Sequence, residues 1–291
     1  MQKQQKQGFI GLLKREKRIP IYRIKVRENE PIVLISDLHI GTRDCNFKAL
    51  KRDIEYFKEI NAHILINGDL FEAITPTDPR YEHDTHGFMT TNDILNTLLQ
   101  LGTETLKPIA NQIRLIGIGN HEYKLIKHYH INITKLLIEE LERISQQKIY
   151  YGRYWGMVVF ENYDQKIKKK LSSYELAYHH GWGGSPKSGT KIGLKDLKQQ
   201  IQADMYWIGH KHQTAIYSEE IYTRTLNYLV AKPHWLISTG AYHQNNHSAQ
   251  ESYTSYAEQK GLLTSSAIPF VILRFIDGKP QFELGTSRIN K

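Results

Sequence analysis

Five short groups of polar residues, each following an apolar run, are the residues of this sequence best suited to chemistry. The first is Asp37-Leu38-His39, which follows the run Ile32–Ser36. A carboxylate oxygen and an imidazole nitrogen together suit Mn, Fe or Zn better than Mg or Ca. The same order of apolar run and polar group recurs at Gly68–Asp69, Asn120–Glu122, His179–His180 and His210–His212. This repetition predicts one metal site assembled from five strand ends.

The elements that must position these groups can be read from the apolar spacing. Continuous apolar runs are typical of strands covered on both faces. The expected strands are residues 32–36, 64–67, 113–118 and 205–208. Apolar residues three and four apart predict amphipathic helices at 46–60, 93–107, 131–144 and 194–203. Alternation of strands and helices implies parallel strands with right-handed crossovers, and ligand sites in such sheets lie beyond the carboxyl ends of the strands.

The pattern changes in the second half of the chain. Residues 148–179 alternate as strands around a turn, and residues 214–291 add more strands, with Asp277-Gly278 as a hairpin turn signal. Residues 252–261 predict a short helix. The two halves together predict an α/β fold in which a second sheet packs on the first.

In this order the five groups resemble the motifs of the calcineurin-like metallophosphoesterases, which are D-x-H, G-D, G-N-H-[DE], H-G and G-H-x-H. The resemblance covers about residues 32–214. It implies a four-layer α-β-β-α sandwich of two mixed sheets and the hydrolysis of phosphate esters. It also implies two divalent metal ions, Mn in the first place and Fe or Zn otherwise, with a hydroxide held between them as the nucleophile.

The resemblance also implies roles for single residues. Asp69 would bridge the two metals, because a carboxylate has two oxygens that can serve two cations. The other ligands would be Asp37, His39 and His212 for the first metal, and Asn120, His180 and His210 for the second. His179 competes with His180, because adjacent strand residues point to opposite faces and only one can reach the metals. The H-G match favours His180.

Three residues are expected in catalysis, namely His121, Asn120 and Glu122. His121 matches the motif histidine that binds no metal, and it would stabilise the transition state or protonate the leaving alkoxide. Glu122 would orient its ring. Lys187 and Lys191 lie in a glycine-rich segment and are candidates for holding substrate phosphates. The alternative for that segment is a mobile loop near the site.

These motifs leave the substrate open. The sequence GDLFEA at 68–73 resembles both the DNA-repair exonucleases and the lipid-A-pathway diphosphatases. The Ser/Thr protein phosphatases instead carry G-D-x-x-D-R-G with a phosphate-binding arginine, and Phe71, Glu72 and Ala73 stand at the corresponding positions here. Three hypotheses follow: a phosphodiesterase or nuclease on nucleic acid, a hydrolase of a small phosphate or diphosphate compound of the nucleotide or nucleotide-sugar type, and a phosphate-binding protein without turnover. Whether the irregular loop 70–92 caps the site is also open.

The charge of the chain favours polyanionic partners. The net charge is +9 and the pI is about 9.3, values found in proteins that bind nucleic acid, anionic membrane surfaces or phosphorylated substrates. Residues 1–28 hold nine Lys or Arg and predict a basic, partly disordered N-terminal arm, with 29–291 as the metallophosphoesterase domain. The aromatic cluster at 150–155 fits strand packing or, alternatively, base stacking.

The sequence also predicts a compartment. No apolar run reaches the roughly 18 residues that a transmembrane segment requires, and the stretch GFIGLL is too short for a signal-peptide core. Cys45 is the single cysteine, so an internal disulfide is excluded and a reducing compartment is allowed. We therefore expect a soluble cytoplasmic protein. The sequence does not indicate its oligomeric state.

Overall fold

The computed structural model describes residues 19–72, 93–164, 166–182, 186–243 and 269–285, and these form two mixed six-stranded sheets. Sheet A has the order β1-β6-β7-β8-β10-β9, and sheet B has the order β12-β11-β2-β3-β4-β5. The strands of sheet A are β1 (Ile21–Arg27), β6 (Trp155–Asp164), β7 (Lys169–His179), β8 (Met205–Ile208), β9 (Ala215–Arg224) and β10 (Leu229–Ser238). The strands of sheet B are β2 (Ile32–Ile35), β3 (His63–Ile66), β4 (Ile113–Gly117), β5 (Tyr150–Arg153), β11 (Phe270–Ile276) and β12 (Lys279–Gly285).

The helices begin at residues that suit a helix start. The Asn46 side chain accepts a hydrogen bond from the backbone N–H of Ala49 at 3.0 Å, and Asn132 does the same for Lys135 at 3.1 Å. The described helices are α2 (Phe47–Glu59), α3 (Ile94–Leu106), the short 3-10 helix η1 (Lys107–Ile109), α4 (Asn120–Tyr129), α5 (Ile133–Ser145) and α6 (Pro186–Gln200). None of them combines the length and the apolar character that crossing a membrane would require.

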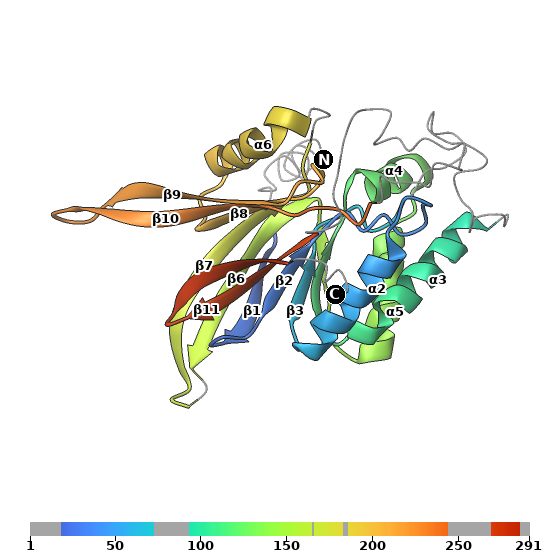
Figure 1. The fold of residues 1–291 in the computed structure, drawn as a ribbon, viewed down its shortest axis with the longest axis horizontal. Coiled ribbons are helices and arrows are strands. Elements are labelled where there is room, and N and C mark those ends of the chain that lie inside the picture. The colour runs from blue at the N-terminus through green and yellow to red at the C-terminus, as the bar shows by residue number, and fades with distance from the viewer. Residues whose placement is uncertain (1–18, 73–92, 165, 183–185, 244–268, 286–291) are drawn as a thin grey trace, which may run out of the picture.

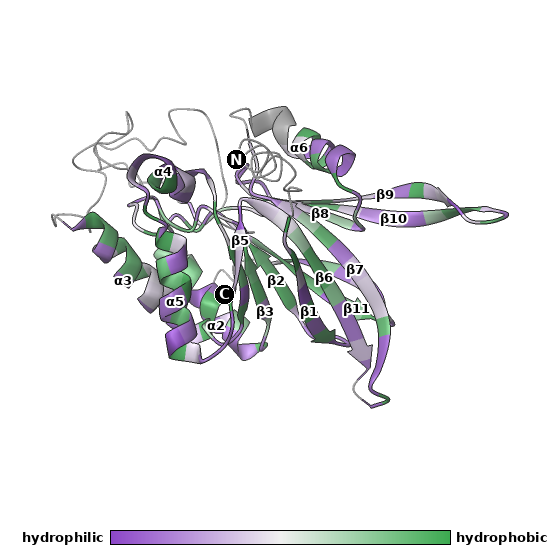
Figure 2. Ribbon diagram, turned by 180° about the vertical axis from the view of Figure 1, so that it is seen from behind, coloured by the Kyte–Doolittle hydropathy of each residue, from purple (hydrophilic) through white to green (hydrophobic). Residues whose placement is uncertain are grey.

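The elements stack in four layers, which confirms the predicted α-β-β-α sandwich (Figure 1). Helices α2, α3 and α5 cover the outer face of sheet B over a core that includes Phe57 and Leu137. A second core, with Leu34 and Trp207, lies between the sheets, and a third packs α6 on sheet A through Leu194. Apolar residues are concentrated on the strands where the layers meet (Figure 2). These three cores fix the strands whose ends carry the polar groups.

The parallel strands place their carboxyl ends side by side. In sheet B, β2 pairs parallel with β3, and β3 with β4. In sheet A, β7 pairs parallel with β8, and β8 with β10. The amphipathic helix α2 connects β2 to β3, as the crossover prediction requires. Six strand ends are therefore available at one edge of the sandwich.

Helix α4 is not predicted by the sequence pattern. It begins at Asn120, three residues after the end of β4. The Glu122 carboxylate accepts the backbone N–H of Gly119 at 2.8 Å, which satisfies a donor that the helix start would otherwise leave open. Helix α6 begins at Pro186, well before the predicted helix 194–203, and a proline is tolerated in the first turn of a helix.

Part of the predicted basic arm belongs to sheet A. Residues Ile21–Arg27 form β1 and pair in parallel with β6. Residues 1–18, most of the loop 70–92 and the predicted helix 252–261 lie outside the described residues. The predicted hairpin turn at Asp277-Gly278 joins β11 to β12, and both turn residues have positive φ, 51° and 70°.

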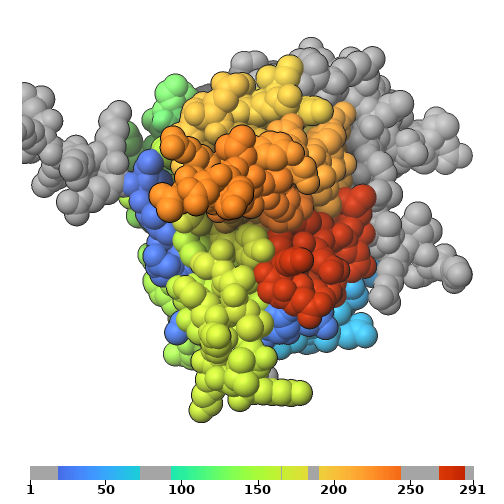
Figure 3. Space-filling model, turned by 90° about the vertical axis from the view of Figure 1, so that its left-hand side faces the viewer, coloured from blue at the N-terminus to red at the C-terminus, as the bar shows by residue number. Residues whose placement is uncertain are grey.

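One hairpin extends away from the sandwich. Strands β9 and β10 pair antiparallel and project beyond the other strands of sheet A (Figure 1). Large apolar side chains are exposed along it, namely Tyr222, Leu226, Tyr228 and Leu229. Figure 3 shows this end of the molecule, where β9 and β10, in orange, lie between α6, in yellow, and the β6–β7 region, in yellow-green.

Candidate metal centre

The polar groups follow the strands through an unusual backbone conformation. Positive φ values occur at Asp37 (54°), His39 (50°), Asp69 (45°), His210 (64°) and His212 (53°). This left-handed region is uncommon for residues other than glycine. It turns the chain as soon as each strand ends, so that residues two positions apart, such as Asp37 and His39, face one point.

Two glycines let the loops after β3 and β4 cross in contact. Gly68 has φ of 74°, and a Cβ there would lie 2.5 Å from the backbone nitrogen of Gly119. A Cβ on Gly119 would in turn overlap the Asp69 carboxylate. Glycine is required at both positions because any side chain would separate Asp69 from the loop that carries Asn120.

The first group of predicted ligands consists of Asp37, His39 and His212. The Nε2 atoms of the two histidines lie 3.2 Å apart. They lie 3.9 Å (His39) and 3.4 Å (His212) from Oδ1 of Asp37. Such separations suit atoms that share one ion at metal–ligand distances of about 2.0–2.2 Å.

The second group is centred on Asp69, His180 and His210, which offer ligand atoms within 4.8 Å of one another. Oδ2 of Asp69 lies 3.1 Å from Nε2 of His180. Asp69 also groups within the same limit with Asp37 and His39. The structure thus brings six predicted Asp and His ligands together, and Asp69 is the residue common to both groups.

The residues present fit metal ions. One buried atom in this cluster, Oδ1 of Asn120, has no hydrogen-bond partner within the described residues, and such atoms are rare unless they serve a ligand. Asp37, Asp69 and Glu72 are buried, and their ion pairs within the same residues are all with histidines. Burial raises the pKa of Asp69, but His180 and His121 hold it well below its usual value, so this carboxylate is ionised. Ionised oxygens and imidazole nitrogens are the donor set of a transition-metal site.

His180, not His179, lies in the cluster. Nδ1 of His180 donates to the backbone oxygen of Asn67 at 2.8 Å, which leaves Nε2 toward Asp69. Burial lowers the pKa of His180, but Asp69 raises it to about 10. The His179 ring instead accepts the N–H of Gly181 at 2.9 Å, and burial lowers its pKa to about 4. The two rings therefore point to opposite sides of β7.

Glu72 is a site residue that the sequence reasoning missed. Its Oε2 lies 2.7 Å from Nδ1 of His39, and its Oε1 lies 3.0 Å from Nδ1 of His121. Burial raises the pKa of Glu72, but His121 and His39 outweigh it and hold this pKa well below its usual value. One carboxylate thus fixes the ring orientation of a predicted ligand and of the predicted acid. The signal was present in the GDLFEA match at 68–73, three residues after Asp69.

The expected role of Glu122 needs correction. Its carboxylate accepts the backbone N–H groups of Asp69 (3.1 Å), Phe71 (2.8 Å) and Gly119 (2.8 Å). Burial and the charge of Asp69 raise the pKa of Glu122. Glu122 therefore holds the two crossing loops together, while Glu72 occupies the orienting position beside His121.

The predicted phosphate-binding lysines are less well placed. The side chain of Lys187 lies outside the described residues. Lys191 is exposed on α6, and its Nζ lies 5.4 Å from the centre of the Tyr217 ring on β9. Lys191 therefore lies over β9 rather than beside the metal cluster.

Aromatic side chains border the second ligand group. The Tyr154 ring lies 5.7 Å from His180 and 5.1 Å from His179, and Trp182 lies 4.6 Å from His179. Tyr123 contacts Tyr154 from α4, at 6.0 Å between ring centres. Tyr123 is 49% exposed, so Tyr123 and Tyr154 offer rings to a ligand at the metal cluster, whereas Trp182 packs on His179, whose ring lies outside the cluster.

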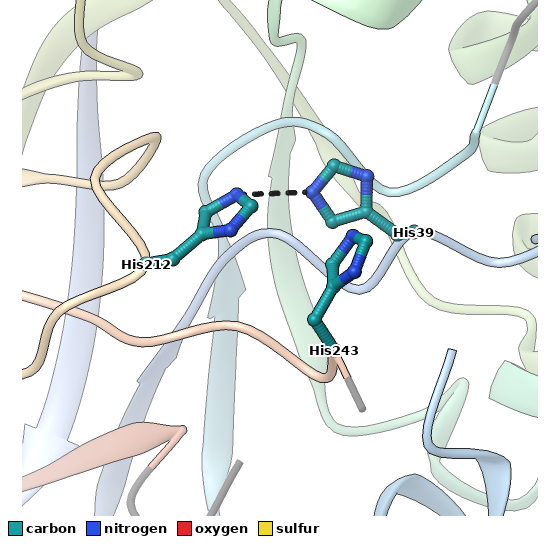
Figure 4. Close-up of side chains that lie close together, drawn as sticks. All are labelled: His39, His212 and His243. Carbon is teal, nitrogen blue, oxygen red and sulfur yellow. Dashed lines mark hydrogen bonds between the residues drawn. The ribbon is translucent and has the colours of Figure 1, made fainter. Parts of the chain in front are cut away.

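His243 also joins the site without being predicted. It follows β10, and it offers a ring nitrogen within 4.8 Å of ligand nitrogens of His39 and His212. Figure 4 shows the three rings converging. Burial, His39 and His212 lower the pKa of His243 well below its usual value. The apolar run Trp235–Ile237 precedes it, but His243 follows Ile237 only after six positions, unlike the short spacing in the five groups.

Comparisons with known proteins point to one family. A family model described as calcineurin-like phosphoesterase matches residues 30–214. No curated protein matches the chain. Similar solved structures include GAP50, described as the anchor in the inner membrane complex of Plasmodium, at 12% identity and a TM-score of 0.48, covering 91% of this chain and 86% of that one. They also include a metallophosphoesterase from Sphaerobacter thermophilus (13% identity, TM-score 0.38, coverage 89% and 90%) and a zinc complex of Vps29 from Entamoeba histolytica (13%, 0.35, 89% and 99%).

Proposed function

Because this chain belongs to the calcineurin-like phosphoesterase family, we propose that it is a two-metal phosphodiesterase that acts on nucleic acid. The chain is a metallophosphoesterase with buried His, Asp and Glu side chains suited to a pair of metal ions. The observation that carries the proposal is the convergence of six Asp and His side chains from four loops, with Asp69 shared between two groups.

The roles of the ligands follow from their grouping. Asp37, His39 and His212 would hold one metal ion, Asn120, His180 and His210 would hold the other, and Asp69 would contact both. Bound divalent ions would supply an activated water and offset the charge of the phosphate oxygens. Asn120 is a neutral ligand, which limits negative charge where a phosphate must bind. Mn is the first expectation for the native metal, with Fe or Zn as alternatives.

His121 and Glu72 supply the proton for the leaving group. The Glu72 carboxylate lies 3.0 Å from Nδ1 of His121, and a neighbouring negative charge stabilises the doubly protonated ring. Nε2 of His121 can then hold a proton and deliver it to the leaving alkoxide. Glu122 has a structural role instead, because its carboxylate holds the backbone of the two loops that carry Asp69 and Asn120.

The aromatic rim and the charge support a nucleic-acid substrate. Tyr154 borders His180 and Tyr123 packs on Tyr154, and aromatic faces stack on nucleobases without regard to sequence. The net charge of +9 favours a polyanion. Single strands or frayed ends suit such a rim better than an intact duplex, because only unpaired bases expose their faces. Lys187 and Lys191 are kept as candidate phosphate contacts.

The domain assignment is part of the proposal. We assign residues 29–291 to the catalytic domain and residues 1–28 to a basic arm, with the correction that Ile21–Arg27 of this arm is strand β1 of sheet A. The arm and the aromatic rim would contact different parts of one nucleic-acid strand. Because contacts to several phosphates release counterions, binding should weaken steeply as the salt concentration rises.

The test separates the reaction from the substrate. Purified protein is loaded with Mn, and elemental analysis is expected to find two ions per chain. Hydrolysis of bis(p-nitrophenyl) phosphate should exceed that of the monoester. Labelled single-stranded DNA, duplex DNA, RNA, mononucleotides and nucleotide-sugar diphosphates are then compared at low and moderate salt.

Each outcome of the substrate comparison has a defined meaning. Salt-sensitive cleavage of single-stranded oligomers, lost in His121→Ala, supports the proposal. Turnover confined to nucleotides or nucleotide sugars replaces it with a small-molecule hydrolase, the alternative that the GDLFEA match favours. Two bound metals with no turnover of any ester would leave a phosphate-binding protein.

A further inference from the structure

A sixth strand end delivers His243 to the metal centre. Strand β10 runs parallel to β8, with Ser238 opposite Ile208. The segment after β10 therefore lies beside the segment that carries His210 and His212. The five motifs of the family match contain neither β10 nor His243.

The residue before His243 is fixed by three hydrogen bonds. The Tyr242 N–H donates to the backbone oxygen of Asp37 at 3.1 Å, and its own backbone oxygen accepts from Asn46 at 2.7 Å. The Tyr242 hydroxyl donates to Asp53 at 3.1 Å, and the side chain is fully buried. His243 is thereby held against the loop of a predicted ligand, with little freedom to turn away.

The His243 ring lies beside two predicted ligands. Its centre is 4.4 Å from that of His39, nearly perpendicular to it, and 5.3 Å from that of His212, nearly parallel to it. One ring nitrogen of each lies within 4.8 Å of the others (Figure 4). Buried Nδ1 of His243 finds no hydrogen-bond partner in the part of the chain that the structure describes.

Packing alone does not account for this arrangement. Apolar side chains would fill the space without bringing nitrogen lone pairs together, and burying an imidazole nitrogen without a partner is costly. The lone pairs of the three converging ring nitrogens can instead bind a common cation. The geometry is that of a site in which a third imidazole is available to the same ion.

We propose that His243 is an additional ligand of the metal ion held by Asp37, His39 and His212. This inference rests on the proposed function, because it assumes a metal at that position. The additional imidazole makes the first position richer in nitrogen than the second. Imidazole-rich sites favour Zn, Fe or Co over Mn, so the two positions should differ in metal preference.

The test uses the full chain and two metals as probes. Metal-free protein is titrated with Zn²⁺ against a chromophoric chelator, and the Co²⁺-substituted protein is examined by visible absorption. His243→Phe keeps a ring packed against His212 but has no ligand atom, and His243→Gln keeps a polar group. The control is His234→Gln, because His234 lies on β10 and stacks on Tyr206, outside the predicted ligand set.

We expect both His243 variants to bind one of two Zn²⁺ ions at least roughly 10–100-fold more weakly, a loss typical of even an outer-shell metal contact. Their Co²⁺ spectra should change in position and intensity, while the His234 variant matches wild type. Unchanged affinities and spectra in both variants, with two metals bound, would overturn the inference and leave the proposed function standing. A loss seen only together with a lowered melting temperature of the metal-free protein also counts against it. Wild type that binds no metal refutes the proposed function itself.

Discussion

Replacing Glu72 with glutamine removes one negative charge from between two imidazoles while keeping the size of the side chain. The carboxylate lies 2.7 Å from Nδ1 of His39 and 3.0 Å from Nδ1 of His121, and it is buried. A carboxylate accepts from both rings, but an amide has one oxygen and one NH₂ group. One ring must then take its proton on Nε2, the nitrogen that faces the metal cluster.

The size of the effect follows from these two contacts. Residues that orient metal-binding histidines change metal affinity or activity by roughly 10–100-fold, which corresponds to about 1.4–2.7 kcal/mol of transition-state stabilisation. Hydrogen bonds to charged groups contribute roughly 1.5–3 kcal/mol each, so the loss of one of the two gives the same range. We expect Glu72→Gln to lower kcat/KM for a phosphodiester by this factor.

The assay measures diester hydrolysis and bound metal in the same samples. A loss of metal would show that Glu72 acts through His39, and a loss of turnover with metal intact would show that it acts through His121. Glu72→Asp keeps the charge but cannot reach both rings, so its activity should be intermediate. Glu104→Gln, at an exposed position of α3, is the control. Activity of Glu72→Gln within about twofold of wild type, far below the range for an orienting residue, would refute the reasoning.

Three further predictions can be checked with single variants. His121→Asn should lower turnover by roughly 10²–10⁴-fold with metal content intact, the range for a positioned acid–base group; full activity would exclude the proposed role. Asp69→Asn should lose more metal by elemental analysis than any other single ligand variant, because both groups contain this residue. His63 accepts a hydrogen bond from Arg114 at 2.9 Å and contacts Glu30 at 3.0 Å, and burial lowers its pKa in the folded protein. Because the folded protein disfavours protonation of His63, stability is lost as the pH falls below the pKa of the unfolded chain, about 6.5. The melting temperature should therefore fall from about pH 7.5 to about pH 5.5, and less steeply in His63→Gln; equal slopes would contradict this.

The predicted ligands could be located from sequence because each one follows a recognisable apolar strand. Asp37, Asp69 and His210 need no long-range information beyond the rule that parallel strands end at one edge. The four-layer arrangement was implied by the resemblance of the five motifs to those of the calcineurin-like metallophosphoesterases. The residues missed by sequence reasoning depend on contacts between elements that are distant in the chain.

Glu122 and Glu72 illustrate the difference. Glu122 adjoins His121 in sequence, which suggested a contact, but both residues lie on α4, and adjacent helix residues do not face each other. Glu72 reaches His121 only because Gly68 and Gly119 let two loops touch. His243 required knowledge that β10 pairs in parallel with β8, and a strand pairing between segments this far apart cannot be read from local pattern.

The left-handed backbone at the predicted ligands places them for metal binding but lowers the stability of the fold. Residues held in such conformations cost of order 1–3 kcal/mol each, and five of them together rival the roughly 5–15 kcal/mol net stability of a typical domain. Glycine at any of these positions would relax the backbone, while the three apolar cores that build the sandwich would be unchanged. Relief of this strain favours the folded state of a variant without the ligands, while the added conformational entropy of glycine in the unfolded chain offsets part of the gain. Selection for turnover is therefore needed to keep the ligands. The fold does not depend on them, so it can persist after hydrolysis is lost and serve in binding.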